Sequence, residues 1–155
     1  MFESLWIDKP EAEAKLTALA SNPATAEVAG HFRHYHQFGY CIIQGAVPPA
    51  VIDQYLEESQ ALIAADKLKI SLGLEIKPAK GADLQIPLTK LLDTHFHSEA
   101  AQRVSFSPPI KQFLETLFGE QALAFQTLHF QTGSTQPVHN DTAYVVLDEP
   151  KSLTA

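Results

Sequence analysis

Apolar residues recur at the three- and four-residue spacing of amphipathic helices over much of the chain. The clearest case follows Pro108 and Pro109, where apolar positions repeat at i, i+3, i+4, i+7 and i+8 before Gly119. Similar patterns, bounded by proline, glycine or Ser-Asn-Pro, predict further helices. In chain order, the predicted helices extend from Asp8 and Pro10 to about Ala20, from beyond Pro23 to about Gln37, from Pro49 through Ile63, over Ser98–Phe106, and from Pro108 to Phe118.

Strand-like patterns are shorter. Tyr40–Gln44, Ala122–Gln131 and Thr142–Leu147 are predicted strands, and the irregular stretch Asp66–Asp83 predicts a mobile loop or a weak hairpin. Side chains alternate between the two faces of a strand, so Ala122–Gln131 presents two sets of residues. Which set is buried stays open at this point. One set is Gln126, Leu128 and Phe130, and the other is Thr127, His129 and Gln131.

Composition and charge limit the classes of protein that fit. The 155 residues are 45% hydrophobic, enough for one ordinary core, and we expect a single domain over residues 1–155. The net charge of -7 and the scattered basic residues argue against a nucleic-acid partner. No stretch approaches the roughly 18 apolar residues of a membrane span. The lone Cys41 rules out an internal disulfide, and we expect a cytoplasmic protein.

The strongest chemical signal is the run His139-Asn140-Asp141. On an extended segment, His139 and Asp141 lie on the same face and offer an imidazole and a carboxylate. These are two of the three protein ligands in a 2-His-1-carboxylate iron site. The alternative is a loop histidine beside a turn-forming Asn-Asp pair. No histidine follows His139 in the sequence, so the run by itself does not complete a ligand set.

Other histidines suggest weaker alternatives. His95 and His97 could form a metal pair, but a solvated approach to a helix accounts for them better. His31 and His34 can share one helix face, but two histidines do not make a metal site, so we expect surface histidines there. His129 is either a substrate-pocket residue or a hydrogen-bonded core histidine, and the second is expected.

The order of motifs along nearly the whole chain resembles one enzyme family. The run Phe38–Pro48 is similar to the opening strand of the phytanoyl-CoA dioxygenase family of Fe(II)/2-oxoglutarate oxygenases, and the helix after it also fits. The later motifs occur in the family's order and approximate spacing, which makes the ordered set more specific than any one piece. These motifs are a helix from Pro108, Leu117-Phe118-Gly119, a strand, Gly133-Ser134, and His139-x-Asp141-x-x-Tyr144.

The resemblance implies an α+β fold, with N-terminal helices packed on the first strands of a double-stranded β-helix (jelly roll). It also implies oxidation of a small molecule or acyl thioester, with Fe(II) as cofactor and 2-oxoglutarate as cosubstrate. His139 and Asp141 match the iron ligands, whereas Gln126 and Lys90 match positions that contact 2-oxoglutarate in some members. Solvated side chains are the alternative for Gln126 and Lys90. Tyr144 either lines the substrate pocket or packs in the core.

The sequence departs from the family after Asp141. A jelly roll needs about eight strands, and the remaining residues suffice for roughly one. We therefore expect an incomplete domain that lacks the distal iron-ligand histidine and the 2-oxoglutarate anchor, is inactive alone, and self-associates through exposed strand edges. Two other functions stay open. One is a non-catalytic remnant or partner-binding jelly-roll module, and the other is a cupin-like metal- or ligand-binding protein.

Overall fold

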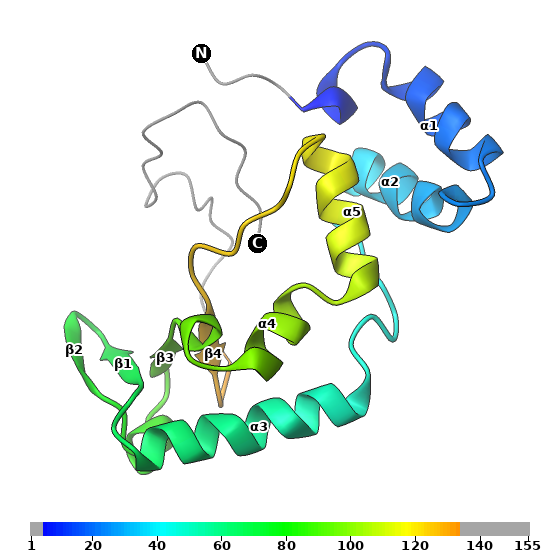
Figure 1. Cartoon of the computed structure of the whole chain (residues 1–155). Helices are drawn as coiled ribbons and strands as arrows, with labels where there is room; N and C mark the ends of the chain where they lie inside the picture. Colours follow the sequence, from blue (N-terminus) through cyan, green and yellow to red (C-terminus); the bar gives the residue numbers. More distant parts are fainter. Residues whose placement is uncertain (1–4, 134–155) are drawn as a thin grey trace. The chain divides into compact units, whose positions relative to one another are not determined.

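The computed structural model describes residues 5–133, in which helices are combined with a four-stranded antiparallel sheet (Figure 1). The sheet is not closed, and the described residues have the expected α+β character. They form two compact units, residues 5–46 with 108–122 and residues 47–107 with 123–133. The single domain over 1–155 therefore stays a prediction. The strand predicted at Thr142–Leu147 lies outside the described residues.

The first unit is helical. It contains α1 (Ala12–Ser21), α2 (Ala26–Phe38) and α5 (Pro108–Phe118), preceded by the 3-10 helix η1 (Trp6–Asp8). All three α-helices were predicted near these positions, and they are confirmed. Gly39 ends α2 in the left-handed conformation, with φ 77°, which a glycine adopts without steric cost.

An aromatic cluster forms the core of the first unit. Phe32 of α2 is fully buried, and its ring stacks on Phe113 of α5 with 4.4 Å between centroids. Trp6 meets Phe32 edge to face at 5.3 Å, and its indole N–H donates to the Thr116 carbonyl oxygen at 2.9 Å. Offset and edge-to-face pairs at such distances are favourable geometries for aromatic rings. The cluster joins the start of the chain to α5, about a hundred residues later.

The strand predicted at Tyr40–Gln44 is wrong, because no described residue pairs with this segment. The predicted alternation is nevertheless present. Tyr40 and Ile42 are exposed, whereas Cys41 and Ile43 pack against the first unit's core. Partial burial raises the pKa of the Cys41 thiol, as expected for a cysteine that acts as a small apolar side chain. Alternation of apolar and polar residues gives an extended segment one buried and one exposed face, but a strand also needs a hydrogen-bonded neighbour.

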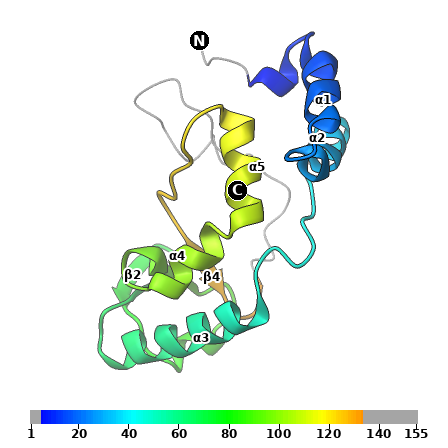
Figure 2. The ribbon, with the colours of Figure 1, turned by 45° about the vertical axis from the view of Figure 1, so that its right-hand side comes forward.

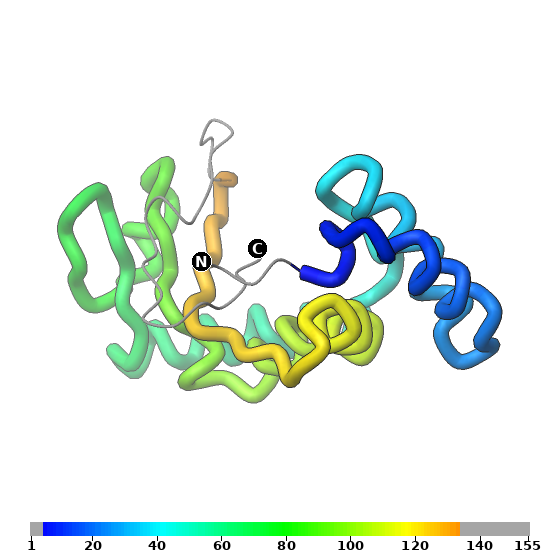
Figure 3. The backbone as a smooth tube through the Cα atoms, turned by 90° about the horizontal axis from the view of Figure 1, so that it is seen from above, coloured from blue at the N-terminus to red at the C-terminus, as the bar shows by residue number. Residues whose placement is uncertain are grey.

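The second unit contains the sheet and two helices. Its helices are α3 (Pro49–Ala64) and α4 (Glu99–Ser105), both predicted, and its 3-10 helices are η2 (Asp83–Gln85) and η3 (Thr94–Phe96). The strands are β1 (Lys69–Leu72), β2 (Glu75–Pro78), β3 (Lys90–Leu92) and β4 (Leu128–Phe130), in the spatial order β2-β1-β3-β4. Figure 3 follows the green hairpin of β1 and β2 and the orange β4, which returns beside β3.

Two sequence predictions in this unit are sharpened. The stretch Asp66–Asp83 contains the hairpin of β1 and β2, turning at Gly73 with φ 60°. The strand predicted over Ala122–Gln131 is observed only at Leu128–Phe130. The large side chains of the first part are exposed, Leu123 by 84% and Phe125 by 51%, and residues 122–126 pair with no strand among the described residues.

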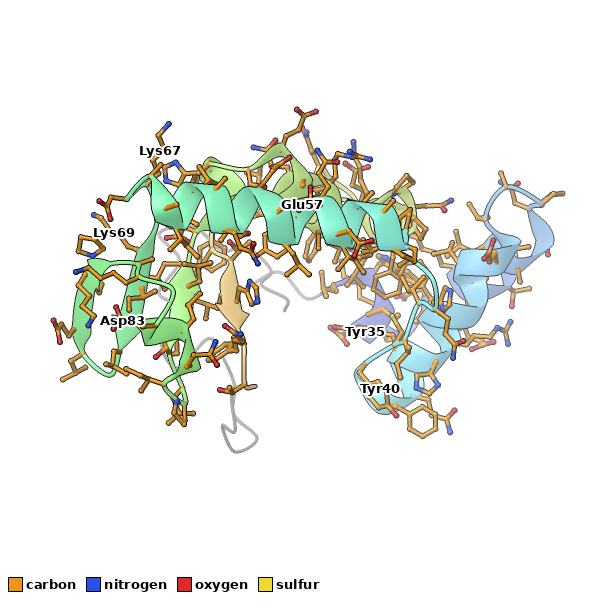
Figure 4. The ribbon with its side chains drawn as sticks, turned by 90° about the horizontal axis from the view of Figure 1, so that it is seen from below. Tyr35, Tyr40, Glu57, Lys67, Lys69 and Asp83 are labelled. Atoms are coloured by element: carbon orange, nitrogen blue, oxygen red, sulfur yellow. The ribbon has the colours of Figure 1, made fainter. Side chains whose placement is uncertain are left out.

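The sheet has one face packed against α3. The register pairs Ile70 of β1 with Leu91 of β3, and Leu91 with His129 of β4, so these three side chains share a face. Ile70 and Leu91 are buried in a cluster against which Leu62 and Ile63 of α3 pack. Figure 4 looks onto α3 with the strands behind it. We call the opposite face, which carries Lys90 and Phe130, the open face, because Ile76 and Leu128 on it are 63% and 40% exposed.

Helices α3 and α4 lie side by side (Figure 2), and a hydrogen-bonded carboxylate joins them. Glu58 accepts hydrogen bonds from the Ser98 hydroxyl at 2.7 Å and from the Ala100 N–H at 3.2 Å. Ser98 also caps α4, because its Oγ accepts from the Ala101 N–H. The Ser98 hydroxyl, together with the Ala100 N–H, lowers the pKa of the Glu58 carboxyl. These hydrogen bonds therefore hold the first turn of α4 against α3.

Across residues 5–133, every helix is too short or too polar to cross a membrane.

Candidate functional site

A cavity of about 380 Å³ lies at the outer edge of β4 in the second unit. Its walls come from α3, η3 and α4, and from both faces of β4, since Leu128 and His129 both line it. Helix α4 contributes small and apolar side chains, Ala101 and Val104. Cavities of this size that combine apolar walls with a few polar groups are typical small-molecule sites.

The polar groups of the cavity belong to a chain of hydrogen bonds between two histidines. The Tyr55 hydroxyl lies 2.7 Å from His129 Nδ1 and 3.5 Å from Thr94 Oγ1. Thr94 Oγ1 lies 3.3 Å from Thr127 Oγ1, which is 3.0 Å from His95 Nδ1. Three hydroxyl groups in succession thus connect His129 at one end with His95 at the other. The two shortest links are the terminal ones, where a hydroxyl meets an imidazole.

Local backbone geometry brings these residues together. Asp93, directly after β3, adopts the left-handed conformation with φ 52°, which Asp tolerates better than most residues. Its N–H donates to the Thr127 carbonyl oxygen at 2.9 Å, and its Oδ1 accepts from the Thr127 N–H at 3.3 Å. The Asp93 side chain therefore continues the pairing of β3 with β4 for one more residue. The turn that follows directs Thr94 and His95 toward Thr127.

The two histidines differ in burial. His129 is half-buried, and burial lowers its pKa, because the charged form loses hydration there. His95 is only 5% exposed, and its Nε2 is buried with no hydrogen-bond partner among the described residues. Its carbonyl oxygen accepts from the side-chain amide of Gln102 at 2.8 Å. The environment therefore favours neutral imidazole at His129.

Of the predicted site residues, only Lys90 and Gln126 belong to the part of the chain that the structure describes. His139, Asp141 and Tyr144 lie outside the described residues. Lys90 is half-buried on β3, with Nζ 5.9 Å from the Phe130 ring centroid. Gln126 is exposed, two residues before β4. Neither Lys90 nor Gln126 lines the cavity.

Sequence reasoning missed most of the cavity. The helix predicted from Pro49 through Ile63 indicates only a packing role for Tyr55, and no sequence motif includes Thr94 or Thr127. The solvated position expected for His95 is wrong, since its side chain is buried, whereas His97 is exposed as expected. The available signal was the alternation in the predicted β4 segment, because Thr127 and His129 share the face that the structure buries against Tyr55. His129 is hydrogen-bonded, as expected, and it also lines a cavity.

A smaller hollow of about 310 Å³ lies in the first unit, beside Cys41. It is lined by His31 and His34, which share a helix face as predicted. The His34 ring packs on Phe38 at 4.6 Å and on Tyr40 at 4.9 Å. These tilted and edge-to-face ring contacts account for His34. Among residues 5–133, no group of three His, Cys, Asp or Glu side chains is placed to hold a metal ion.

Removing the Tyr55 hydroxyl tests the hydrogen-bond chain. Tyr55→Phe is expected to lower the free energy of unfolding by about 1 kcal/mol, because it leaves His129 Nδ1 without its partner at 2.7 Å. Urea denaturation measures the change. Tyr40→Phe is the matched control, since Tyr40 is 55% exposed, and it is expected to change stability by less than about 0.5 kcal/mol. Equal effects of the two substitutions would contradict a bond between Tyr55 and His129.

The chemistry available at the cavity is hydrogen bonding rather than ion pairing. Within residues 5–133, no Asp, Glu, Lys or Arg lines it, and its hydroxyl and imidazole groups are held by one another or by the backbone. It can therefore orient a small molecule through one or two polar contacts.

Compared with known proteins, the chain matches no family model, no curated protein and no solved structure.

Proposed function

We propose that the chain is part of an Fe(II)/2-oxoglutarate-dependent dioxygenase of the phytanoyl-CoA dioxygenase type. The observation that carries the proposal is the two-sided sheet of the second unit. Helix α3 packs on one face, and the open face carries Lys90 and Phe130. In a jelly roll, the face without helices points into the roll, where the metal and cosubstrate bind.

Lys90 is suited to hold an anionic cosubstrate. It pairs across the sheet with Phe130, and its ammonium group has no carboxylate partner within residues 5–133. Gln126 lies two residues before β4, and if the alternation of the strand continued that far it would lie on the side of Phe130. An ammonium and an amide on one side of the sheet can bind a carboxylate through ionic and neutral hydrogen bonds. This arrangement supports cosubstrate roles for both residues, as the family resemblance implies.

The iron ligands in this proposal are His139 and Asp141. His139 comes nine positions after Phe130, the last residue of β4. Imidazole and carboxylate are a donor pair that Fe(II) accepts, and the carboxylate also offsets part of the metal's charge. Bound iron would supply the activation of dioxygen and the oxidation of a C–H bond. The chain itself would orient the cosubstrate through Lys90 and exclude water with the apolar side chains of the open face.

Metal titration of the full chain tests the ligand assignment. Fe(II), added without oxygen, is expected to broaden the NMR signals of the His139 ring before those of exposed His97. Asp141→Ala is expected to weaken the binding about tenfold or more, since it removes one of the two ligands. Asn140→Ala is the matched control, because in an extended segment its side chain points away from the pair. Equal broadening of His97 and His139, or an Asp141→Ala variant with unchanged affinity, would contradict the assignment.

The same substitutions have a catalytic readout when a third ligand is present. In a version of the protein that carries a further histidine ligand, His139→Ala or Asp141→Ala is expected to abolish decarboxylation of 2-oxoglutarate. Retained turnover would refute the assignment. Stoichiometric Fe(II) binding without any turnover would instead favour a cupin-like metal-binding protein.

A further inference from the structure

The cavity at the edge of β4 offers a site that does not depend on iron. Among the described residues, its lining contains no Asp, Glu, Lys or Arg, and burial lowers the pKa of His129, which favours the neutral imidazole. Its walls are mostly apolar, with Leu128 and Phe130 on one side and Val104 on another. Desolvating an ion in such a place is costly without an opposite charge to pair with it. The walls therefore favour a neutral ligand with an apolar body.

The unpartnered nitrogen of His95 decides the direction of the hydrogen-bond chain. A buried N–H without an acceptor is rarer and more costly than a buried lone pair without a donor. His95 Nε2 has no partner within residues 5–133, so we place the lone pair there and the proton on Nδ1. His95 Nδ1 then donates to Thr127 Oγ1.

With His95 Nδ1 as the donor at one end, only one arrangement lets each of the three hydroxyl groups donate once within these contacts. In it, Thr127 donates to Thr94, Thr94 donates to Tyr55, and Tyr55 donates to His129 Nδ1. A neutral imidazole has one N–H, so a His129 that accepts at Nδ1 carries its proton on Nε2. His129, which lines the cavity, therefore has an N–H group at Nε2 that can donate a hydrogen bond. The tautomer of buried His95, at one end of the hydrogen-bond chain, thus determines the tautomer of His129 at the other end.

We propose that this cavity binds a small neutral carbonyl compound whose oxygen accepts a hydrogen bond from His129 Nε2. The apolar body of the ligand packs on Val104, Leu128 and Phe130. Since a carboxylate would be desolvated with no cation beside it, the site discriminates against acids of the same shape. The proposal holds whether or not His139 and Asp141 bind iron.

Three naphthalenes of similar shape test the proposal with the full chain. 2-Acetylnaphthalene carries the carbonyl, 2-ethylnaphthalene lacks it, and 2-naphthoate replaces it with a charge. The ketone is expected to bind about fivefold more tightly than the hydrocarbon, the gain from one neutral hydrogen bond, and the acid is expected to bind most weakly. Long-range ¹⁵N–¹H spectra of the histidine rings, recorded during each titration, report the tautomer and the contact. His129 Nε2–H is expected to be present before the ketone is added and to shift downfield with it.

His129→Phe removes the donor and keeps a ring in its place. In this variant the ketone and the hydrocarbon are expected to bind equally, whereas the control His97→Phe, at an exposed position, keeps the fivefold preference. Equal affinity of the two ligands for the unmodified chain overturns the proposal, and so does a His129 ring protonated at Nδ1. Both measurements use the unmodified protein, so they decide the matter even if His129→Phe does not fold.

Discussion

Replacing Phe32 by alanine is expected to lower the free energy of unfolding by about 3–5 kcal/mol, the range for removing a fully buried aromatic side chain. Phe32 is 0% exposed, stacks on Phe113 at 4.4 Å and meets Trp6 at 5.3 Å. The substitution removes the ring that joins α2 to η1 and α5, and the surrounding side chains can fill the space only in part. Urea denaturation followed by circular dichroism and by Trp6 fluorescence measures the loss.

Phe38→Ala is the matched control, because it makes the same change on the same helix. Phe38 is 54% exposed, and its ring contacts the rings of His34 and Tyr40, which are close to it in the sequence. Its removal is expected to cost less than about 1 kcal/mol. Equal losses for Phe32→Ala and Phe38→Ala would show that the aromatic cluster is not the core of the first unit.

The same experiment tests the prediction of one domain over residues 1–155. In a single cooperative domain, fluorescence of Trp6 in the first unit and circular dichroism of both units follow one transition. Phe32→Ala then shifts both signals together. Two separated transitions, of which only one responds to Phe32→Ala, would show that the two units fold as separate domains.

The helices could be predicted from the sequence because their signals are local. Proline at the start of α3 and α5, and glycine after α2 and α5, supply the boundaries, and the apolar spacing supplies the buried face. Ser98 illustrates the same principle, since its hydroxyl group accepts from a backbone N–H three residues later. Such features need no knowledge of the rest of the chain.

The strands could be predicted only in part, because pairing is not local. Tyr40–Gln44 alternates as a strand does and yet has no hydrogen-bonded neighbour among the described residues. Lys90–Leu92 has no distinctive pattern, and it becomes a strand because β1 pairs on one side and β4 on the other. Three-residue strands fall below the length at which periodicity distinguishes strand from loop.

The cavity was beyond sequence reasoning for the same reason. Tyr55, Thr94 and His129 come from three separate elements, and the bonds among them span up to 74 positions in the chain. No spacing rule connects them. A tyrosine in an apolar helix stripe gives no sign that its hydroxyl group meets an imidazole, so the hydrogen-bond chain becomes visible only when α3 and β4 are packed together.

Replacing Ile70 by alanine is expected to lower the free energy of unfolding by about 2–5 kcal/mol, as for other large-to-small changes in a core. Ile70 is 0% exposed in the central strand β1, among Leu91 of β3 and the side chains of α3 that pack on the cluster. The cost combines the lost apolar contacts with the cavity that remains. Urea denaturation with circular dichroism measures it.

Ile76→Ala controls for the change in strand propensity, because it makes the same substitution in the neighbouring strand β2. Ile76 lies on the open face and is 63% exposed, so its loss is expected to cost less than about 1 kcal/mol. The comparison bears directly on the proposed function. Lys90 can hold a cosubstrate only if its face of the sheet remains accessible, and Ile76 shares that face through the register with Ser71. If Ile76→Ala lowers the free energy of unfolding as much as Ile70→Ala does, both faces of the sheet are packed. That result would contradict the proposed cosubstrate role of Lys90.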